Sequence, residues 1–364
     1  MDRDGAQNAK AEVFEQAFGF RAVPTALDAD AVPVFAPVPD TQAHRDIVRA
    51  RRNRKADPRD LIALGTLPPA GHNRDPSDLS LGIFIQHNRL RQHPIVEAAQ
   101  RIARGEARVI FTGPARRRGA VNPGRCRPVR IGSSVAHHRV TAGTLGCFCR
   151  SRTGGGIGLL SNNHVLADTN KGRPGDIIVQ PGRVDGGGRG IAESHIATLY
   201  RSVDIDFSPG GRNLVDCAFA YLLDDVPYEP DTVADPLDPA TAWRIAEAED
   251  LLVERDVVQK VGRTTGLTRG TVTAVDVDNL VVQMVLGATA RHARFDRQIA
   301  IEGDGRTFSK GGDSGAVIFT TDGRPVALLF AGTETRSRGS SGITYANPIA
   351  TVLEALDVEI YTGP

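Results

Sequence analysis

Cysteine is scarce in this chain, with four among 364 residues, and its spacing argues against both disulfides and a metal site. Cys147 and Cys149 lie two residues apart on an expected strand, so their side chains share one face and their Cα atoms lie about 6.6 Å apart, beyond the usual disulfide spacing. A zinc site formed by these two, Cys217 and a histidine would lack the paired Cys-x-x-Cys spacing. We therefore expect buried free thiols, and neither a metal nor another cofactor.

An excess of charge is also absent, because 44 Lys and Arg residues against 43 Asp and Glu residues leave a net charge of +1. This balance removes any whole-protein argument for nucleic acid or an anionic membrane as the partner. No stretch approaches the roughly 18 apolar residues of a membrane span. The start of the chain, MDRDGAQNAKAEVFEQ, lacks the basic residues and apolar run of a secretory signal. We expect a cytoplasmic protein.

Aromatic residues are few, at 5% of the chain, whereas 40% of the residues are hydrophobic and 39 are glycine. This composition indicates a globular protein with an aliphatic core and many turns. The length exceeds the roughly 100 to 200 residues of one domain, so it predicts two or three compact units.

Residues 1–135 are expected to form an N-terminal extension whose function the sequence does not show. The proline-rich stretch before residue 40 is typical of an extended linker, and IVEAAQRIARGEARVIFTG predicts a short helix followed by a strand. Basic residues gather here: Arg49, Arg51, Arg52, Arg54, Lys55, Arg116, Arg117, Arg118, Arg125, Arg127 and Arg130. They form either a solvated face or a docking patch for an acidic regulatory partner; nucleic acid is disfavoured, because no nucleic-acid motif accompanies them. We expect this segment to regulate or recruit rather than catalyse.

After Val140 the chain consists of short apolar runs separated by Gly, Asp and Pro, a pattern typical of antiparallel barrels or sandwiches. We predict an all-β fold with a first β unit at 140–228, a linker at 229–250 and a second unit at 251–364. A short helix near the end of the chain would have Asn347 as its cap and Pro348 in its first turn.

The strongest local signal is the sequence Gly312-Asp313-Ser314-Gly315 ahead of an apolar strand. A glycine two residues before a serine lets the amides of Gly312 and Ser314 converge on a developing oxyanion. Taken alone, the same four residues also suit a simple turn between strands.

Two weaker sequence signals, a histidine and an aspartate, accompany this serine. His164 follows an apolar strand in LLSNNHVLA and could take the proton of a nucleophilic serine, although a lone histidine there is usually structural. Asp216 interrupts the apolar run NLVDCAFAYL, and a buried carboxylate needs a partner such as a histidine; an aspartate facing water is the alternative. The order His, Asp, Ser is that of the chymotrypsin triad and differs from the orders in subtilisin and the α/β hydrolases.

On these residues the chain from about Val140 resembles the chymotrypsin and trypsin-like (PA clan) serine peptidases, especially bacterial α-lytic-like or glutamyl members and plant narrow-leaf-like members. Residues 163–167, 215–218 and 312–315 match the three catalytic segments, and VGRTTGLTRGTV at 261–272 is similar to the hairpin that opens the second barrel of bacterial members. The resemblance implies two antiparallel six-stranded-type barrels and a serine endopeptidase with the triad His164, Asp216 and Ser314.

The family's cysteine after the histidine is replaced by Val165, which agrees with an intracellular setting. Pancreatic members free an amino terminus that pairs with the acid beside the serine, here Asp313; with some 140 residues ahead, we expect an internal partner instead.

The resemblance places the substrate pocket at Phe308, six residues before the nucleophile, and at Phe330, Ala331 and Gly332 of a strand that pairs with the bound peptide. None of these residues is charged, so a buried Lys or Arg of the substrate would have no partner. We predict cleavage after small or medium apolar residues. A catalytically silent or regulatory binding protein on the same fold is the alternative function.

Overall fold

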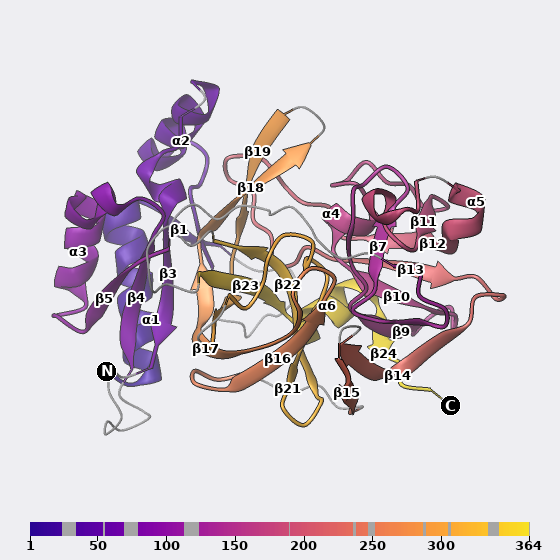
Figure 1. Cartoon of the computed structure of the whole chain (residues 1–364). Helices are drawn as coiled ribbons and strands as arrows, with labels where there is room; N and C mark the ends of the chain where they lie inside the picture. The colour runs from indigo at the N-terminus through magenta and orange to yellow at the C-terminus, as the bar shows by residue number, and fades with distance from the viewer. Residues whose placement is uncertain are drawn as a thin grey trace.

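The computed structural model describes residues 1–23, 34–53, 55–68, 79–112, 124–188, 190–235, 238–246, 252–286, 289–304, 307–333 and 342–363. Arg54, Arg116, Arg117 and Arg118 of the basic stretch lie outside these ranges. Within these ranges, no helix has the length and apolar character needed to cross a membrane. Figure 1 shows three bodies in a row, with the N-terminal segment at one end and the barrel that holds His164 at the other.

The second barrel lies in the middle of the molecule and is a closed barrel of six antiparallel strands. Its strands follow the order β16-β21-β22-β23-β20-β17, and pairing of β16 with β17 closes it. Their bounds are β16 (Val257–Gly262), β17 (Gly266–Asp278), β20 (Gln298–Gly303), β21 (Val317–Thr320), β22 (Pro325–Gly332) and β23 (Ile343–Pro348). A separate hairpin of β18 (Leu280–Leu286) and β19 (Thr289–Phe295) projects between β17 and β20.

The first barrel is a curved sheet in the order β24-β9-β10-β13-β12-β11-β7-β8. Its strands are β7 (Ser134–His137), β8 (Gly143–Thr144), β9 (Cys147–Ser151), β10 (Ile157–Ser161), β11 (Ile177–Val179), β12 (His195–Ser202), β13 (Ala218–Leu222) and β24 (Val358–Ile360), and it also carries the short helices α4 (Asn163–Leu166) and α5 (Ile191–Ser194). The all-β prediction of two chymotrypsin-like barrels is confirmed. The barrel contains strands outside the predicted range 140–228. Strand β7 lies before Val140, and the C-terminal strand β24 adds to the sheet beside β9.

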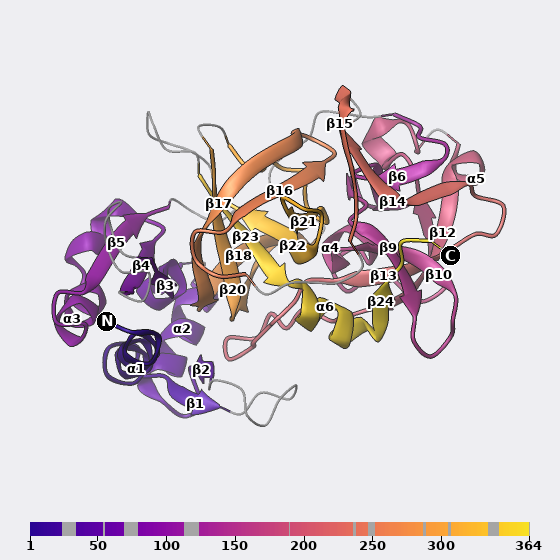
Figure 2. The same ribbon diagram turned by 90° about the horizontal axis from the view of Figure 1, so that it is seen from below.

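The C-terminal helix is present as α6 (Ile349–Leu356), and Figure 2 shows it between the two barrels, ahead of β24. The predicted cap is wrong. Pro348 is the residue before the helix, no side chain caps it, and Asn347 belongs to β23. The Asn347 side chain instead reaches Asp216, which makes it part of the candidate site.

The expected linker at 229–250 contains a hairpin of β14 (Tyr228–Asp235) and β15 (Asp238–Arg244), and β14 pairs with β6 (Val129–Ile131). Val233 and Ile245 are buried in the core of the first barrel. The prolines that suggested a linker are compatible with such a ribbon, because proline is tolerated in peripheral strands.

The described residues of the N-terminal segment, 1–23, 34–53, 55–68 and 79–112, form a folded α/β body. It consists of α1 (Arg3–Val13), a π-helical turn (Phe14–Phe18), β1 (Arg21–Val23), β2 (Val34–Ala36), α2 (Gln42–Arg52), β3 (Ile62–Leu67), β4 (Ser80–Ile85), α3 (Pro94–Ile102), β5 (Ala107–Phe111) and short 3-10 turns at Pro58–Leu61 and Asn88–Gln92. The predicted helix and strand near residue 100 are confirmed as α3 and β5. Most of the proline-rich stretch expected to be a linker, residues 24–33, lies outside the described residues. The residues before it are helical: Asp2 caps α1 by accepting a bond from the Gly5 N–H, and Val13, Phe14 and Phe18 are fully buried.

This segment is continuous with the second barrel. Strand β3 pairs with the far end of β17, which extends the barrel sheet through β4 and β5. Ala63, Leu67 and Phe84 share a buried apolar cluster with barrel residues of β17 to β23. Lys10 Nζ lies 2.9 Å from Asp278 Oδ2, and both side chains are 4% exposed. The segment is therefore packed into the body of the protein.

The four cysteines are free thiols. Cys147, Cys149 and Cys217 are buried, and the Sγ atoms of the first two lie 3.7 Å apart, as expected for side chains on one face. Burial raises the pKa of Cys149 and of Cys217 well above the usual thiol value, so both stay protonated at neutral pH.

Candidate active site

His164 lies on the one-turn helix α4, which follows β10 on the side of the first barrel that faces the second (Figure 1). The Asn163 side chain holds this turn, since its Nδ2 donates to Val203 O at 2.7 Å and its Oδ1 accepts from the Asn170 N–H at 3.0 Å. The sequence predicted His164 at a strand end; the strand in fact stops at Ser161. The helical turn lifts the imidazole out of the sheet, and the side chain is only 2% exposed.

Asp216 lies next to His164 and holds its imidazole from one side. The Asp216 Oδ2 atom is 2.5 Å from His164 Nδ1, and Oδ1 accepts a bond from the His164 backbone N–H at 3.2 Å. Strand β13 begins only at Ala218, so Asp216 precedes the strand in which it was predicted. The carboxylate is fully buried, which fits a group whose charge is met by an adjacent donor.

Two side chains that sequence reasoning missed fix the backbone of Asp216. Asn347 Oδ1 accepts from the Asp216 N–H at 3.0 Å, and Asn162 Nδ2 donates to the Asp216 carbonyl at 2.7 Å. Asn347 comes from β23 of the second barrel, so the carboxylate is positioned from both barrels. The Asn-Asn pair before His164 was visible in the sequence, but Asn347, 131 positions from Asp216, carried no signal beyond its place before a proline.

Ser314 lies in the loop between β20 and β21, and this loop is fastened to Thr144 of the first barrel. The Thr144 N–H donates to Ser314 O at 2.8 Å, and Thr144 Oγ1 donates to Gly312 O at 2.8 Å. Gly315, with a φ of 92°, has no room for a side chain, because an added Cβ would lie 1.9 Å from Ser161 Oγ. The loop that carries Ser314 is therefore in direct contact with β10, the strand that precedes His164.

Gly143 of the first barrel lies beside both the residue that follows His164 and the backbone of Ser314. A Cβ added at Gly143 would lie 2.4 Å from a methyl group of Val165, the residue after the histidine, and 3.1 Å from Ser314 O. Within the described ranges, His164 Nε2 is buried and has no hydrogen-bond partner. With Nδ1 donating to a carboxylate, Nε2 is the free acceptor of the ring. Ser314 is 6% exposed.

The backbone around Ser314 leaves two donors open. Among the described residues, no acceptor bonds to the N–H of Gly312 or of Ser314, whereas the Asp313 N–H donates to Lys310 O and the Gly315 N–H to Leu329 O. Gly312 adopts a φ of 94°, a conformation that favours glycine. The role of these two amides as donors to an oxyanion stays a prediction.

Asp313 is fully buried and has an internal partner, Lys260 of β16, whose Nζ lies 3.6 Å from Asp313 Oδ2. Asp313 Oδ1 accepts from the N–H of Thr264 at 2.7 Å, and Oδ2 accepts from Thr265 Oγ1 at 2.7 Å. These groups lie on the hairpin of β16 and β17, whose sequence was singled out by resemblance. Lys260 itself was not predicted, since a lysine in a short strand is normally exposed.

The predicted substrate pocket is divided between two cores. Phe308 is 1% exposed and packs inside the second barrel near Lys260, whereas Phe330 and Ala331 belong to a different cluster and Phe330 packs on Phe295. The Phe308 carbonyl accepts a hydrogen bond from Thr268 Oγ1 at 2.7 Å. Phe308 is therefore in a different apolar cluster from Phe330 and Ala331, and their joint role as a substrate pocket stays a prediction.

Gly332 is half-buried, and its neighbours are polar. A Cβ added there would lie 3.5 Å from Ser309 Oγ, which is hydrogen-bonded to Thr344 Oγ1 at 2.7 Å. A pair of hydroxyl groups therefore stands where the apolar wall was expected.

No family profile and no curated protein matches the sequence. Solved structures similar to this chain include Thermobifida fusca protease A, with 16% identity, TM-score 0.44, and coverage of 65% of this chain and 100% of that one. A glutamic acid specific serine protease has 19% identity, TM-score 0.45, and coverage of 64% and 100%. Cellulomonas bogoriensis chymotrypsin has 17% identity, TM-score 0.43, and coverage of 65% and 99%. These neighbours are chymotrypsin-like serine proteases, and the likeness concerns the fold.

Proposed function

We propose that this protein is a serine endopeptidase that hydrolyses peptide bonds through an acyl-enzyme. The observation that carries the proposal is the contact of 2.5 Å between Asp216 Oδ2 and His164 Nδ1, with the opposite ring nitrogen buried and without a hydrogen-bond partner among the described residues. Burial of a carboxylate or an imidazole costs free energy unless a hydrogen-bond partner compensates it, as Asp216 and His164 do for each other. Contacts through Gly143 and Thr144 support Ser314 as the nucleophile.

In this mechanism Ser314 Oγ attacks the scissile carbonyl while His164 Nε2 accepts its proton. Asp216 keeps the other ring proton on Nδ1 and stabilises the imidazolium that forms. The N–H groups of Gly312 and Ser314 donate to the oxyanion of the tetrahedral intermediate. His164 then returns its proton to the leaving amine, and water hydrolyses the acyl-enzyme by the same steps.

We further propose that Lys260 takes the place of a free amino terminus in ordering the serine loop. A buried carboxylate beside the nucleophile needs a compensating charge, and the lysine ammonium supplies it from within the second barrel. The loop would then be assembled without cleavage of the chain.

The residue before the cut is proposed to be small and uncharged. The hydroxyl groups of Ser309 and Thr344 bond to each other beside Gly332, and Phe308 is turned into the barrel core. A Lys or Arg of the substrate would find no carboxylate among these residues.

Labelling with a fluorophosphonate probe tests the proposal, because only an activated serine reacts. We expect the wild type to be labelled at Ser314 and the variants Ser314→Ala and His164→Ala to remain unlabelled and folded. A folded wild-type protein that resists the probe would instead favour a silent binding protein. Casein hydrolysis by purified Ser314→Ala, free of contaminating protease, would contradict the assignment.

A further inference from the structure

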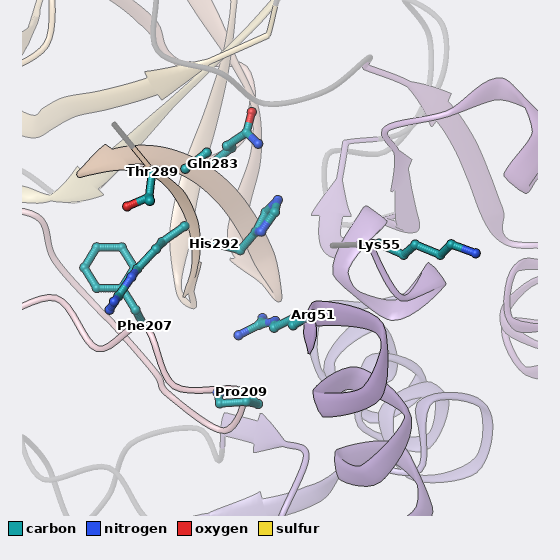
Figure 3. Close-up of a pocket in the computed structure, with 9 residues that line it drawn as sticks. Arg51, Lys55, Phe207, Pro209, Gln283, Thr289 and His292 are labelled. Carbon is teal, nitrogen blue, oxygen red and sulfur yellow. The ribbon is translucent and has the colours of Figure 1, made fainter. Parts of the chain in front are cut away.

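A pocket of about 640 Å³ lies where the N-terminal segment meets both barrels (Figure 3). Its lining includes Arg51 and Lys55 from the N-terminal segment, Phe207 and Pro209 from the loop between β12 and β13, and Arg291 and His292 from β19. Figure 3 shows Arg51 reaching from α2 toward Phe207, while Lys55 extends away from it. The proposed catalytic groups do not line this pocket.

The loop that supplies Phe207 and Pro209 joins the two sides of the candidate active site. It starts near Val203, whose carbonyl is held by Asn163 beside His164, and it ends at Asn213, three residues before Asp216. The Asn213 N–H donates to Arg294 O at 3.0 Å, which fastens the loop to β19. The pocket is thus built on the same backbone that positions the histidine and the carboxylate.

The pocket also adjoins the strand expected to pair with a bound peptide. Phe207 packs against the apolar cluster that contains Phe330 and Ala331 of β22. The Gly315 N–H donates to Leu329 O at 2.8 Å, so the residues after Leu329 lead away from the nucleophile. A peptide antiparallel to β22, with its scissile bond at Ser314, would extend its preceding residues in that direction.

The charges that face the pocket are positive and only partly balanced. Arg51 is neutralised by Asp60, with N···O distances of 3.2 Å, and also donates to Ser208 O. Within the described residues, Arg291 has no ion-pair or hydrogen-bond partner. Burial, with a contribution from Arg51, lowers the pKa of His292 below its usual value, so the ring is neutral at pH 7 and can donate a hydrogen bond. Arg291 therefore leaves an excess of positive charge in the pocket that Phe207 and Pro209 also line.

We propose that this pocket binds an acidic side chain of the peptide substrate, a Glu or Asp located N-terminal to the scissile bond. The inference rests on the proposed peptidase function and assigns the N-terminal segment a part in substrate recognition, through Arg51. Arg291 contacts the substrate carboxylate, and Arg51 shapes the pocket by joining α2 to the loop at Ser208.

The test is cleavage of a peptide library by the full chain, with Glu, Gln or Lys placed at each position before the cut. The wild type is expected to cleave peptides with Glu at one upstream position about threefold to tenfold faster, in kcat/KM, than those with Lys, as suits a partly exposed ion pair. Arg291→Glu should reverse this ratio, and Arg291→Gln should bring it close to one. Arg152→Glu changes an exposed arginine in the turn between β9 and β10 and serves as the charge-matched control.

Fluorophosphonate labelling of the same samples separates the two proposals. Equal labelling of wild type and variants, with the ratio changed only in the Arg291 variants, supports the pocket. If labelling is equal, and wild type and Arg291→Glu have the same Glu-to-Lys ratio of kcat/KM at every upstream position, the pocket proposal is wrong. The peptidase proposal is unaffected by that result. Absence of labelling in every folded sample overturns both.

Discussion

The substitution Asp216→Asn isolates the role of the carboxylate, because the amide has almost the same shape. The Asp216 Oδ1 atom accepts from the His164 backbone N–H, so the amide oxygen of an asparagine is required at that position. The amide NH₂ is then left facing His164 Nδ1, where it can only donate. The imidazole would have to carry its proton on Nε2 instead, toward Ser314.

A histidine protonated on Nε2 cannot accept the serine proton, so acylation should nearly stop although the fold is kept. A wrong tautomer at this position lowers turnover by a factor on the order of 10⁴, or about 5 kcal/mol in the activation free energy. The opposite orientation of the amide is also unfavourable, because its NH₂ group would then face the His164 backbone N–H and both groups are donors.

The assay is the second-order rate constant for fluorophosphonate labelling, with thermal unfolding measured on the same samples. Asp225→Asn changes an exposed aspartate in the first barrel and controls for the loss of one charge. A folded Asp216→Asn variant that is labelled within tenfold of the wild-type rate would refute the tautomer argument and the role given to Asp216.

Three further predictions test buried charges. Lys260→Met should lower the free energy of unfolding by about 3 kcal/mol and slow probe labelling, because Asp313 stays buried without its cation; urea unfolding and labelling rates measure this, and unchanged values would exclude the proposed loop-ordering role. Lys10→Met should lower the free energy of unfolding by a similar amount, because it leaves Asp278 buried without its cation. In urea unfolding, the double variant Lys10→Met with Asp278→Asn should regain part of that stability. If the losses of the two single variants simply add in the double variant, the proposed ion pair is contradicted. Burial raises the pKa of Asp296 from 3.8 to about 6, so its protonated form stabilises the fold at low pH and this contribution, about 3 kcal/mol, is lost as the pH rises from about 4 to about 6. Asp296→Asn should therefore gain stability relative to wild type over that pH range, and a constant difference would contradict the shift.

The N-terminal segment shows where local sequence patterns were insufficient. A polar, alanine-rich start followed by prolines is typical of a linker, yet Val13, Phe14 and Phe18 are fully buried. Their apolar partners are supplied by later parts of the same segment, up to Ala103. Helix stability comes mainly from such packing, so the pattern alone could not predict α1.

The surroundings of the expected pocket residues show a related limit. The spacing of six residues before Ser314 singled out Phe308, whose side chain packs in the core of the second barrel and whose carbonyl accepts a bond from Thr268 Oγ1. The residues next to Phe308 in the sequence do not predict these tertiary contacts. The same holds for Asn347, whose place before a proline favoured a helix cap although its side chain meets Asp216 in the other barrel.

The sequence by itself determined the two β units and the candidates His164, Asp216 and Ser314, because alternating apolar residues, glycines at the turns and the order of the three groups are properties of local segments. Only the tertiary structure decided which groups support them. Thr144, Asn347 and Lys260 act across contacts between strands that lie far apart in the chain, and such contacts are fixed by the packing of whole sheets. The pairing of β3 with β17 also depends on the tertiary structure. An unpaired strand edge can bond to any strand that lies beside it, so the local sequence does not specify the partner.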